Sequence, residues 1–266
     1  MAHGQGRGTT GAATPKRSPR ESFITVYGRK PVQEVLLDDD LAVDKLVVAE
    51  NVSRPAVRHL LELADRRGVP LEWATPQHVK RLAGNGKHDQ GVVADVVAPG
   101  LRSLADYVRS APPDAAVFVV DGVTNPANVG MIIRTATAAG FDAVVLPSAG
   151  SPGVGPLVIK ASAGIAYRAG IVRCRRPEEA LQALREAGFT TYGLDATAGE
   201  TLWEAPLAGR AAFVLGNETD GLSPACREVL DQDLAIPMQH GVESLNVASS
   251  AAVVAFEVAR RRFPRG

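Results

Sequence analysis

The sequence predicts an α/β protein in two parts, a small N-terminal α/β domain and a larger C-terminal domain built on a parallel sheet with helices on both faces. Strand-like and helix-like segments alternate along the chain with short connections, which is typical of such a sheet. The run "AAVFVVD" at 115–121 is apolar and rich in β-branched residues, as expected for a strand that is covered on both sides. Pro and Gly residues between 99 and 113 interrupt the alternation and indicate a boundary.

The N-terminal elements follow from periodicity and breakers. Residues 1–21 are expected to form a disordered basic tail, because they are rich in Gly, Thr and Arg and cannot bury apolar surface. Residues 22–98 are expected to form the small domain. Its predicted elements are a helix within 26–37, a strand at 45–50, a helix at 54–68, a strand at 69–74, a short helix at 76–82 and a strand at 90–98.

The C-terminal elements alternate more regularly. Residues 99–114 are predicted to be a linker around a short helix at 103–110, and residues 115–266 to be the second domain. Strands are predicted at 115–121, 141–147, 169–174, 190–195, 211–216 and 232–238. Helices are predicted at 127–139, after 156, at 177–188, after Ser223 and from Ser244 onward.

Charge balance, cysteine content and hydrophobicity limit the partners, metal sites and cellular location that the sequence allows. The 29 basic and 29 acidic residues balance, so a nucleic-acid partner would need a local basic patch, such as Arg173, Arg175 and Arg176 or the arginines at 260–265. Cys174 and Cys226 have no metal-ligand spacing, and we expect no metal site. The longest apolar runs fall short of the ~18 residues of a membrane span, and no secretory signal is present, so we expect a cytoplasmic protein.

Ligand sites in parallel α/β sheets lie at the carboxyl ends of the strands. We therefore expect the site to be formed by the loops after Asp121, Leu215 and Ile236. In the first loop, turn formation and helix capping account for Asn125 and Pro126. They do not account for Arg134, which lies in a small, apolar helix and is either at the surface or placed there for function.

The other two loops are also unusual. Two glycines frame the polar residues of "LGNETDGLS", as in a tight turn whose backbone can approach a ligand closely. The segment 244–256 carries no charge, so part of the predicted final helix is expected to face another subunit. Helix capping explains Ser244 but leaves Asn246 unexplained.

Together, "NPANVGMIIRTA", "VLGNETDGLS" and "IPMQHGVESLNVASSAAVVAF" resemble the three motifs of the SpoU (TrmH-like) RNA 2′-O-ribose methyltransferases of the SPOUT superfamily. The segments "VYGRKPVQEVL" and "HDQGVVADV" resemble the RNA-binding substrate domain of the members that act on ribosomal RNA. The resemblance implies a C-terminal trefoil knot, S-adenosylmethionine as cofactor, an RNA substrate, and a homodimer formed through the knot region and the final helix. Ribosomal RNA, of the large subunit in particular, is favoured by the N-terminal domain.

The resemblance also assigns residues. The implied catalytic residues are Asn128, Arg134, Glu218, Ser244 and Asn246, and the implied cofactor-binding residues are Leu215, Gly216, Asn217, Ile236, Met238, Leu245 and Asn246. Arg29, Lys160 and Ser162 are implied RNA contacts. A guanidinium is effectively always protonated, so we expect Arg134 to stabilise negative charge on the 2′-oxygen and to hold a phosphate rather than to take up a proton.

Four alternatives remain open at this point. The chain could be a catalytically silent RNA-binding protein of the same fold, although it retains Arg134, Glu218 and Asn246. It could methylate transfer RNA, or a base nitrogen, although "NPANVG" followed by Arg134 resembles the ribose-directed branch. A nicotinamide dehydrogenase is disfavoured, because "GSPGVG" does not match G-x-G-x-x-G.

Overall fold

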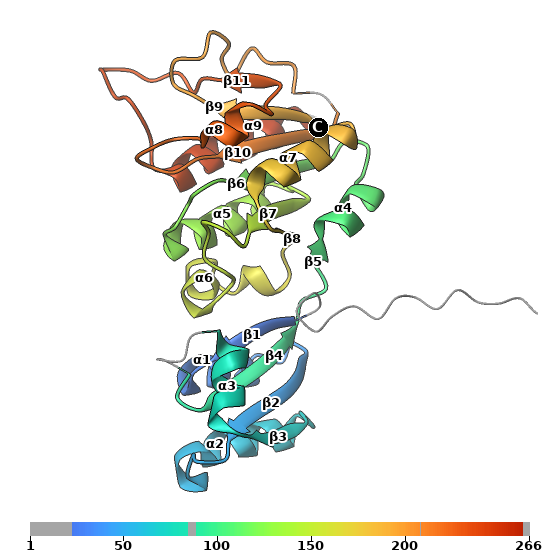
Figure 1. The fold of residues 1–266 in the computed structure, drawn as a ribbon, viewed down its shortest axis with the longest axis vertical. Helices are drawn as coiled ribbons and strands as arrows, with labels where there is room; N and C mark the ends of the chain where they lie inside the picture. The colour runs from blue at the N-terminus through green and yellow to red at the C-terminus, as the bar shows by residue number, and fades with distance from the viewer. Residues whose placement is uncertain (1–22, 85–88, 208, 263–266) are drawn as a thin grey trace, which may run out of the picture.

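The computed structural model describes residues 23–84, 89–207 and 209–262, arranged as two units one above the other (Figure 1). The predicted basic tail and Arg265 lie outside the described residues. The lower unit in Figure 1 contains a four-stranded sheet, and the upper unit contains a seven-stranded sheet. No helix in the described ranges is long and apolar enough to cross a lipid bilayer.

The N-terminal unit is a mixed sheet with helices packed against it. Its strand order is β1-β4-β2-β3, in which β4 runs antiparallel to both of its neighbours and β3 runs parallel to β2. The strands are β1 (Phe23–Tyr27), β2 (Val43–Ala49), β3 (Leu71–Ala74) and β4 (Val92–Val97). The helices are α1 (Arg29–Leu37), α2 (Arg54–Arg66) and α3 (Pro76–Ala83).

Strand β1 was not predicted, because the sequence analysis placed a helix from residue 26. The strand passes into α1 through Gly28 alone, whose φ of 90° is a conformation that side-chain-bearing residues rarely adopt. Ile24 and Val26 are fully buried, while Phe23, Thr25 and Tyr27 are only half-buried. This alternation is the signature of a strand with one core face, but five residues are too few to separate it from the start of a helix.

The C-terminal unit has the predicted architecture. Its strands, in the order β11-β9-β10-β6-β7-β8-β5, are all parallel. They are β5 (Leu101–Ser103), β6 (Ala116–Val120), β7 (Ala143–Pro147), β8 (Ile171–Cys174), β9 (Thr190–Leu194), β10 (Ala211–Leu215) and β11 (Gln232–Leu234). The connecting helices are α4 (Leu104–Ser110), α5 (Pro126–Ala138), α6 (Pro156–Ala161), α7 (Pro177–Glu186), α8 (Pro224–Arg227) and α9 (Val247–Arg262), with a 3₁₀ turn η2 at Ile165–Tyr167.

Alternate residues of the central strands enter two separate cores. Phe118 and Val120 of β6 pack in the cluster that includes the buried faces of α5 and α9. Val117 and Val119, on the opposite side of the same strand, pack with residues of α4, α7 and α8. A strand that is buried on both sides has no polar face, which explains the uninterrupted apolar run that predicted it.

The segment 99–114 is part of the larger domain and not a plain linker. Residues Leu101–Ser103 form β5, which pairs with β8 at the edge of the parallel sheet, and α4 begins directly after it with the Ser103 hydroxyl as its cap. A Cβ at Gly100 would lie 2.2 Å from the backbone oxygen of Ala169, so the chain packs closely here. A three-residue strand carries too little periodicity to be predicted from sequence.

The final helix begins later than predicted and is capped by another residue. It starts at Val247, and the Asn246 side-chain oxygen accepts hydrogen bonds from the backbone N–H groups of Ala248 (2.9 Å) and Ser249 (3.4 Å). Ser244 therefore lies in the preceding loop and is not the cap. The prediction that Ser244 caps the helix is therefore wrong, and the cap is Asn246, which capping arguments had left unexplained.

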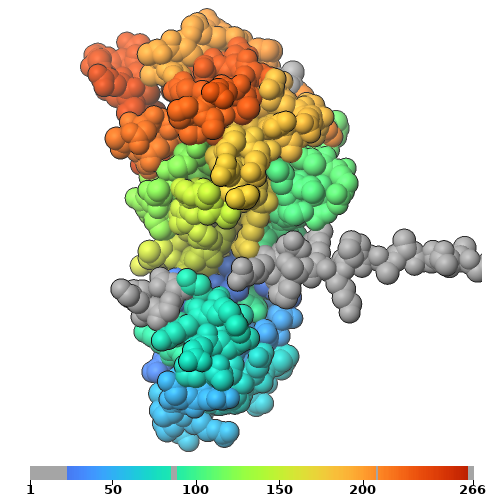
Figure 2. Space-filling view, in the orientation of Figure 1, coloured from blue at the N-terminus to red at the C-terminus, as the bar shows by residue number. Residues whose placement is uncertain are grey.

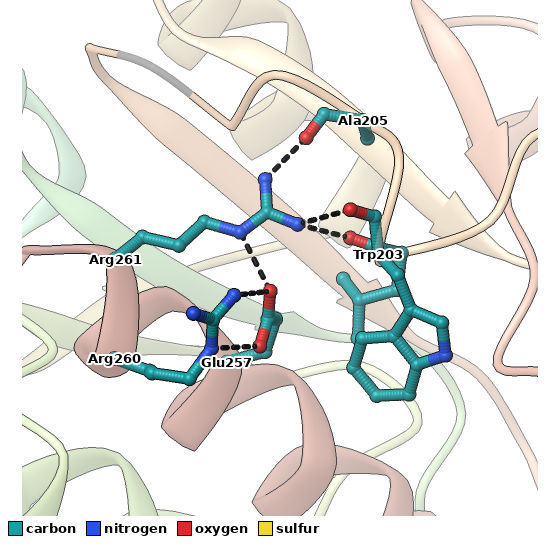
Figure 3. A network of polar contacts seen from close by, with 6 residues as sticks. Trp203, Ala205, Glu257, Arg260 and Arg261 are labelled. Carbon is teal, nitrogen blue, oxygen red and sulfur yellow. Dashed lines mark hydrogen bonds and ion pairs between the residues drawn. The ribbon is translucent and has the colours of Figure 1, made fainter.

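Side chains at the end of α9 anchor this helix to the loop between β9 and β10 (Figure 3). Buried Glu257 accepts hydrogen bonds from Arg260 at 2.8 Å and from Arg261 at 2.6 Å. Arg261 also donates to the backbone oxygens of Leu202, Trp203 and Ala205. Arg261, which the sequence suggested as part of a basic patch, is thus committed to internal contacts.

We predict that acid destabilises the protein through Glu257. The hydrogen bond from Arg260, together with Arg261, lowers the pKa of Glu257 to about 2 from 4.5. A depressed folded-state pKa means that the stabilisation is complete above about pH 5 and is lost as the pH falls toward 2. Between pH 6 and pH 3 the wild type should lose about 2 kcal/mol more unfolding free energy than Glu257→Gln, measured by urea denaturation. Parallel pH dependences of the two proteins would contradict this.

Candidate active site

The loops singled out in the sequence meet at one edge of the parallel sheet. Strands β9, β10 and β6 are neighbours, so the loops that follow their carboxyl ends lie side by side. The loops after β9 and β10 and the segment that precedes α9 enclose a cavity of about 360 Å³, while no residue of the loop after β6 belongs to its lining. Of the seven residues expected to bind the cofactor, six line this cavity, namely Leu215, Gly216, Asn217, Ile236, Met238 and Leu245, whereas Asn246 is not part of the lining.

The loop after β10 is held by its own backbone and by Asn217. The backbone N–H groups of Asn217 and Gly221 donate to each other's oxygens, at 2.9 and 3.0 Å. The Asn217 amide donates to the Gly122 oxygen at 2.8 Å, and its side-chain oxygen accepts from the N–H groups of Thr219 and Asp220. Asn217 therefore ties the loop after β10 to the loop after β6, while still lining the cavity.

Gly216 is the narrowest point of this loop. A Cβ at Gly216 would lie 2.5 Å from the backbone carbon of Gly221 and 2.8 Å from the nitrogen of Leu222. Both atoms belong to the backbone and cannot swing away. The loop can close in this way only because residue 216 has no side chain.

Three of the predicted catalytic residues form one hydrogen-bonded cluster beside the cavity. The Asn128 amide of α5 donates to a carboxylate oxygen of Glu218, and the Asn246 amide donates to the Asn128 oxygen at 3.3 Å. Asn128 is buried, 5% exposed, so its polar atoms need these partners. Asn246 thus has two roles: its side-chain oxygen caps α9, and its side-chain amide belongs to this cluster. These contacts explain why an Asn stands at this position, which the sequence alone had left open.

The structure does not bring the other two predicted catalytic residues into this cluster. Ser244 lines the cavity but is exposed and makes no hydrogen bond within the described part of the chain. Arg134 lies on the exposed side of α5, outside the cavity lining, and forms no ion pair or hydrogen bond with another described residue. An exposed guanidinium without a partner is available for a ligand.

Three charged residues of the cavity, Asp195, Arg227 and Glu243, were not found from the sequence. Asp195 follows β9, and Arg227 of α8 donates a hydrogen bond to its carboxylate at 2.9 Å. The hydroxyl and N–H of Thr197, followed by Arg227, lower the pKa of Asp195 to about 2, so it is ionised at neutral pH. The strand-end rule that selected the other loops would also have selected Asp195, whereas nothing in the sequence distinguishes Arg227.

The cavity suits S-adenosylmethionine in size and charge. Its volume falls within the range of small-molecule sites, about 300–1,000 Å³. The carboxylates of Asp195, Glu218 and Glu243 line it and complement a sulfonium and an ammonium group, and Arg227 can face a carboxylate. Among the described residues, no group of three or more His, Cys, Asp or Glu side chains is placed to hold a metal ion.

The predicted RNA contacts have different surroundings. Arg29 is exposed at the start of α1, and Lys160 lines a second cavity, of about 500 Å³, between α1 and α6. Ser162 is fully buried; its hydroxyl donates to the Ile159 oxygen at 2.9 Å and accepts from the Ala166 N–H at 3.2 Å. The prediction that Ser162 contacts a phosphate is therefore wrong, because its hydroxyl completes the turn between α6 and η2.

Comparison with known proteins identifies the family. Residues 115–256 match the SpoU rRNA Methylase family, and residues 25–101 match the family described as RNA 2′-O ribose methyltransferase substrate binding. The 23S rRNA (guanosine-2′-O-)-methyltransferase RlmB of Xylella fastidiosa is 34% identical over 89% of this chain and 96% of its own length. A putative TrmH family tRNA/rRNA methyltransferase of Bacillus subtilis, YacO, is 30% identical over 91% of this chain and 97% of its own.

A solved structure shows the same fold with the cofactor bound. The SpoU methyltransferase AviRb of Streptomyces viridochromogenes, in complex with S-adenosylmethionine, superposes with a TM-score of 0.63 at 27% identity, and the match covers 91% of each chain. The two matched families, the shared fold and the cofactor-sized cavity all indicate the same kind of enzyme. The chain therefore belongs to the SpoU rRNA methylase family and is an S-adenosylmethionine-dependent RNA 2′-O-ribose methyltransferase.

Proposed function

We propose that this enzyme methylates the ribose 2′-hydroxyl of a guanosine in large-subunit ribosomal RNA. The observation that carries the proposal is the cluster of Asn128, Glu218 and Asn246, which joins one residue from each of the three motif segments beside the cofactor cavity. The name of the RlmB relative and the match of residues 25–101 to a substrate-binding family support ribosomal RNA and guanosine.

When bound, S-adenosylmethionine supplies an activated methyl group. Glu218 and Asn246 hold the Asn128 side chain in one orientation, which leaves its second amide hydrogen for the substrate ribose. The exposed Arg134 contributes positive charge for the developing 2′-oxyanion and for an adjacent phosphate. The residues thus act mainly by aligning the reactants, and we propose that the hydroxyl proton leaves to water.

Methyl transfer from radiolabelled S-adenosylmethionine tests this function. Unmethylated 23S ribosomal RNA, 16S ribosomal RNA and transfer RNA, all transcribed in vitro, are offered separately, and labelled RNA is digested to nucleosides. We expect label in 23S RNA as a single 2′-O-methylguanosine. Label in transfer RNA alone would replace the proposed substrate. Binding of S-adenosylmethionine without transfer to any RNA or to ribosomal particles would favour a catalytically silent protein.

We also propose that two copies associate through the knot region and α9, and that the C-terminal segment forms the trefoil knot implied by the resemblance. Supporting the association, the uncharged start of α9 leaves Phe256 54% exposed, and Met131 of α5 and Leu245 are 40% and 39% exposed. Apolar side chains of this size at the surface favour a partner. Light scattering of the pure protein measures the mass. A ribosomal RNA substrate would place the enzyme in the cytoplasm.

A further inference from the structure

A groove of about 500 Å³ lies between the two units, apart from the cofactor cavity. The N-terminal unit contributes β1 and α3, and the C-terminal unit contributes the loop after β7 and the end of β8. Figure 2 shows the waist of the molecule, where the teal surface of the N-terminal unit meets the yellow-green surface of the C-terminal unit. We call the groove lined by these elements of both units the interdomain groove.

One wall of the interdomain groove is one face of β1, on which Tyr27 also packs against the small apolar cluster that includes Val79 of α3. Phe23, Thr25 and Tyr27 line the groove, while Ile24 and Val26, between them, are fully buried in the core. The strand therefore presents two aromatic rings on the same side. The Tyr27 hydroxyl lies 3.8 Å from where a Cβ of Gly155 would be, so this aromatic wall faces the glycine-containing loop after β7.

The interdomain groove is basic. Its described lining residues include Arg81 and Arg173 and no acidic side chain. Arg81 is exposed, and its one hydrogen bond to a described residue is with the His78 ring at 2.8 Å, which leaves most of its guanidinium available. The exposed Arg175 adjoins the groove, because its backbone oxygen accepts a hydrogen bond from Ala149 in the loop after β7. Arg173 and Arg175 belong to the segment "VRCRRP", and neither arginine lines the cofactor cavity.

Backbone contacts connect the interdomain groove to the cofactor cavity. Gly150, in the loop after β7, lies so near the loop after β6 that its Cβ would be 3.9 Å from the Gly122 Cα. The Gly122 oxygen in turn accepts the Asn217 amide at 2.8 Å, and Asn217 lines the cofactor cavity. A chain lying in the groove would thus reach the methyl-donor site along the carboxyl edge of the sheet.

We propose that the interdomain groove binds an unpaired RNA segment next to the target nucleotide, with bases stacked on Phe23 and Tyr27 and phosphates paired with Arg81, Arg173 and Arg175. Aromatic rings combined with a basic track are the chemistry that recognises single-stranded nucleic acid. A duplex would keep its bases stacked on one another and away from these rings. The proposal rests on the proposed function, because it takes the ligand to be part of the methylated RNA.

The test compares two double variants with the wild type. Arg81→Ala/Arg175→Ala removes two groove arginines, and Arg58→Ala/Arg109→Ala removes one exposed arginine from each unit elsewhere, with side chains 81% and 69% exposed. For the groove variant we expect the KM for the 23S RNA transcript to rise at least about tenfold, with kcat and S-adenosylmethionine affinity unchanged. The slope of log binding constant against log salt should become shallower by about 1.4, as for two lost phosphate contacts to a single strand. The control variant should match the wild type.

Tyr27→Leu and Tyr27→Phe test the stacking separately. The Phe variant keeps the ring and should bind the transcript like the wild type, whereas the Leu variant keeps apolar volume without a ring and should bind about tenfold more weakly. Equal KM values and salt slopes for the groove and control variants would overturn the proposal, as would a duplex competitor that displaces the transcript as well as a single strand does. If the wild type binds RNA but transfers no methyl group, the proposed function fails, and the salt slopes still decide whether the groove binds RNA.

Discussion

Arg134→Ala is expected to lower turnover by about 10²–10³ while leaving cofactor binding intact. Arg134 is exposed, forms no hydrogen bond or ion pair with a described residue and lies outside the cofactor cavity, so its removal should change neither the melting temperature nor the affinity for S-adenosylmethionine. Loss of one positive donor at a developing oxyanion costs about 10²–10³ in kcat. The measurement is kcat for methyl transfer to 23S RNA, beside calorimetric titration of the cofactor.

Arg134→Lys serves as the matched variant. Lysine keeps the positive charge but not the planar pair of donors that can hold an oxyanion and a phosphate together. We expect it to recover part of the lost kcat, which a purely structural role for Arg134 would not produce. Unchanged turnover in Arg134→Ala would remove this residue from the mechanism.

Gly216→Ala is expected to have the second large effect, on cofactor binding. The added methyl group would lie 2.5 Å from the Gly221 carbon, so the loop after β10 must open. This loop and the cavity share Gly216, Asn217 and Gly221, so the opening distorts the cofactor site. We expect at least a hundredfold weaker binding of S-adenosylmethionine, about 3 kcal/mol, with a loss of stability of about 1–3 kcal/mol from overpacking.

Gly199→Ala is the control for that substitution. Gly199 lies in the connection between β9 and β10, and a Cβ there would meet no atom within 4 Å. It should therefore bind the cofactor with wild-type affinity. Wild-type affinity in Gly216→Ala as well would show that the loop after β10 does not shape the cofactor site.

Much of the architecture follows from local patterns. The apolar strands β6, β7 and β10 are buried on both faces, so the sequence shows them as uninterrupted runs, and the alternation with helices predicts a parallel sheet. Strands β1 and β5 were missed because both are short. Each is stabilised by pairing with a strand that is far away in the sequence, β1 with β4 and β5 with β8. Pairing of this kind leaves no local periodicity to detect.

The sequence by itself determined the fold class, the loops that carry the chemistry and, through resemblance, the family. The strand ends that selected those loops are set by hydrophobic periodicity, which is a local property. Only the tertiary structure decided how the side chains are used. It showed that Asn246 caps α9 and binds Asn128, that Ser162 is buried, and that Asp195 and Arg227 join the cavity. The Asn246–Asn128 and Arg227–Asp195 hydrogen bonds join residues that are tens to more than a hundred positions apart, and such contacts exist only after the chain has packed.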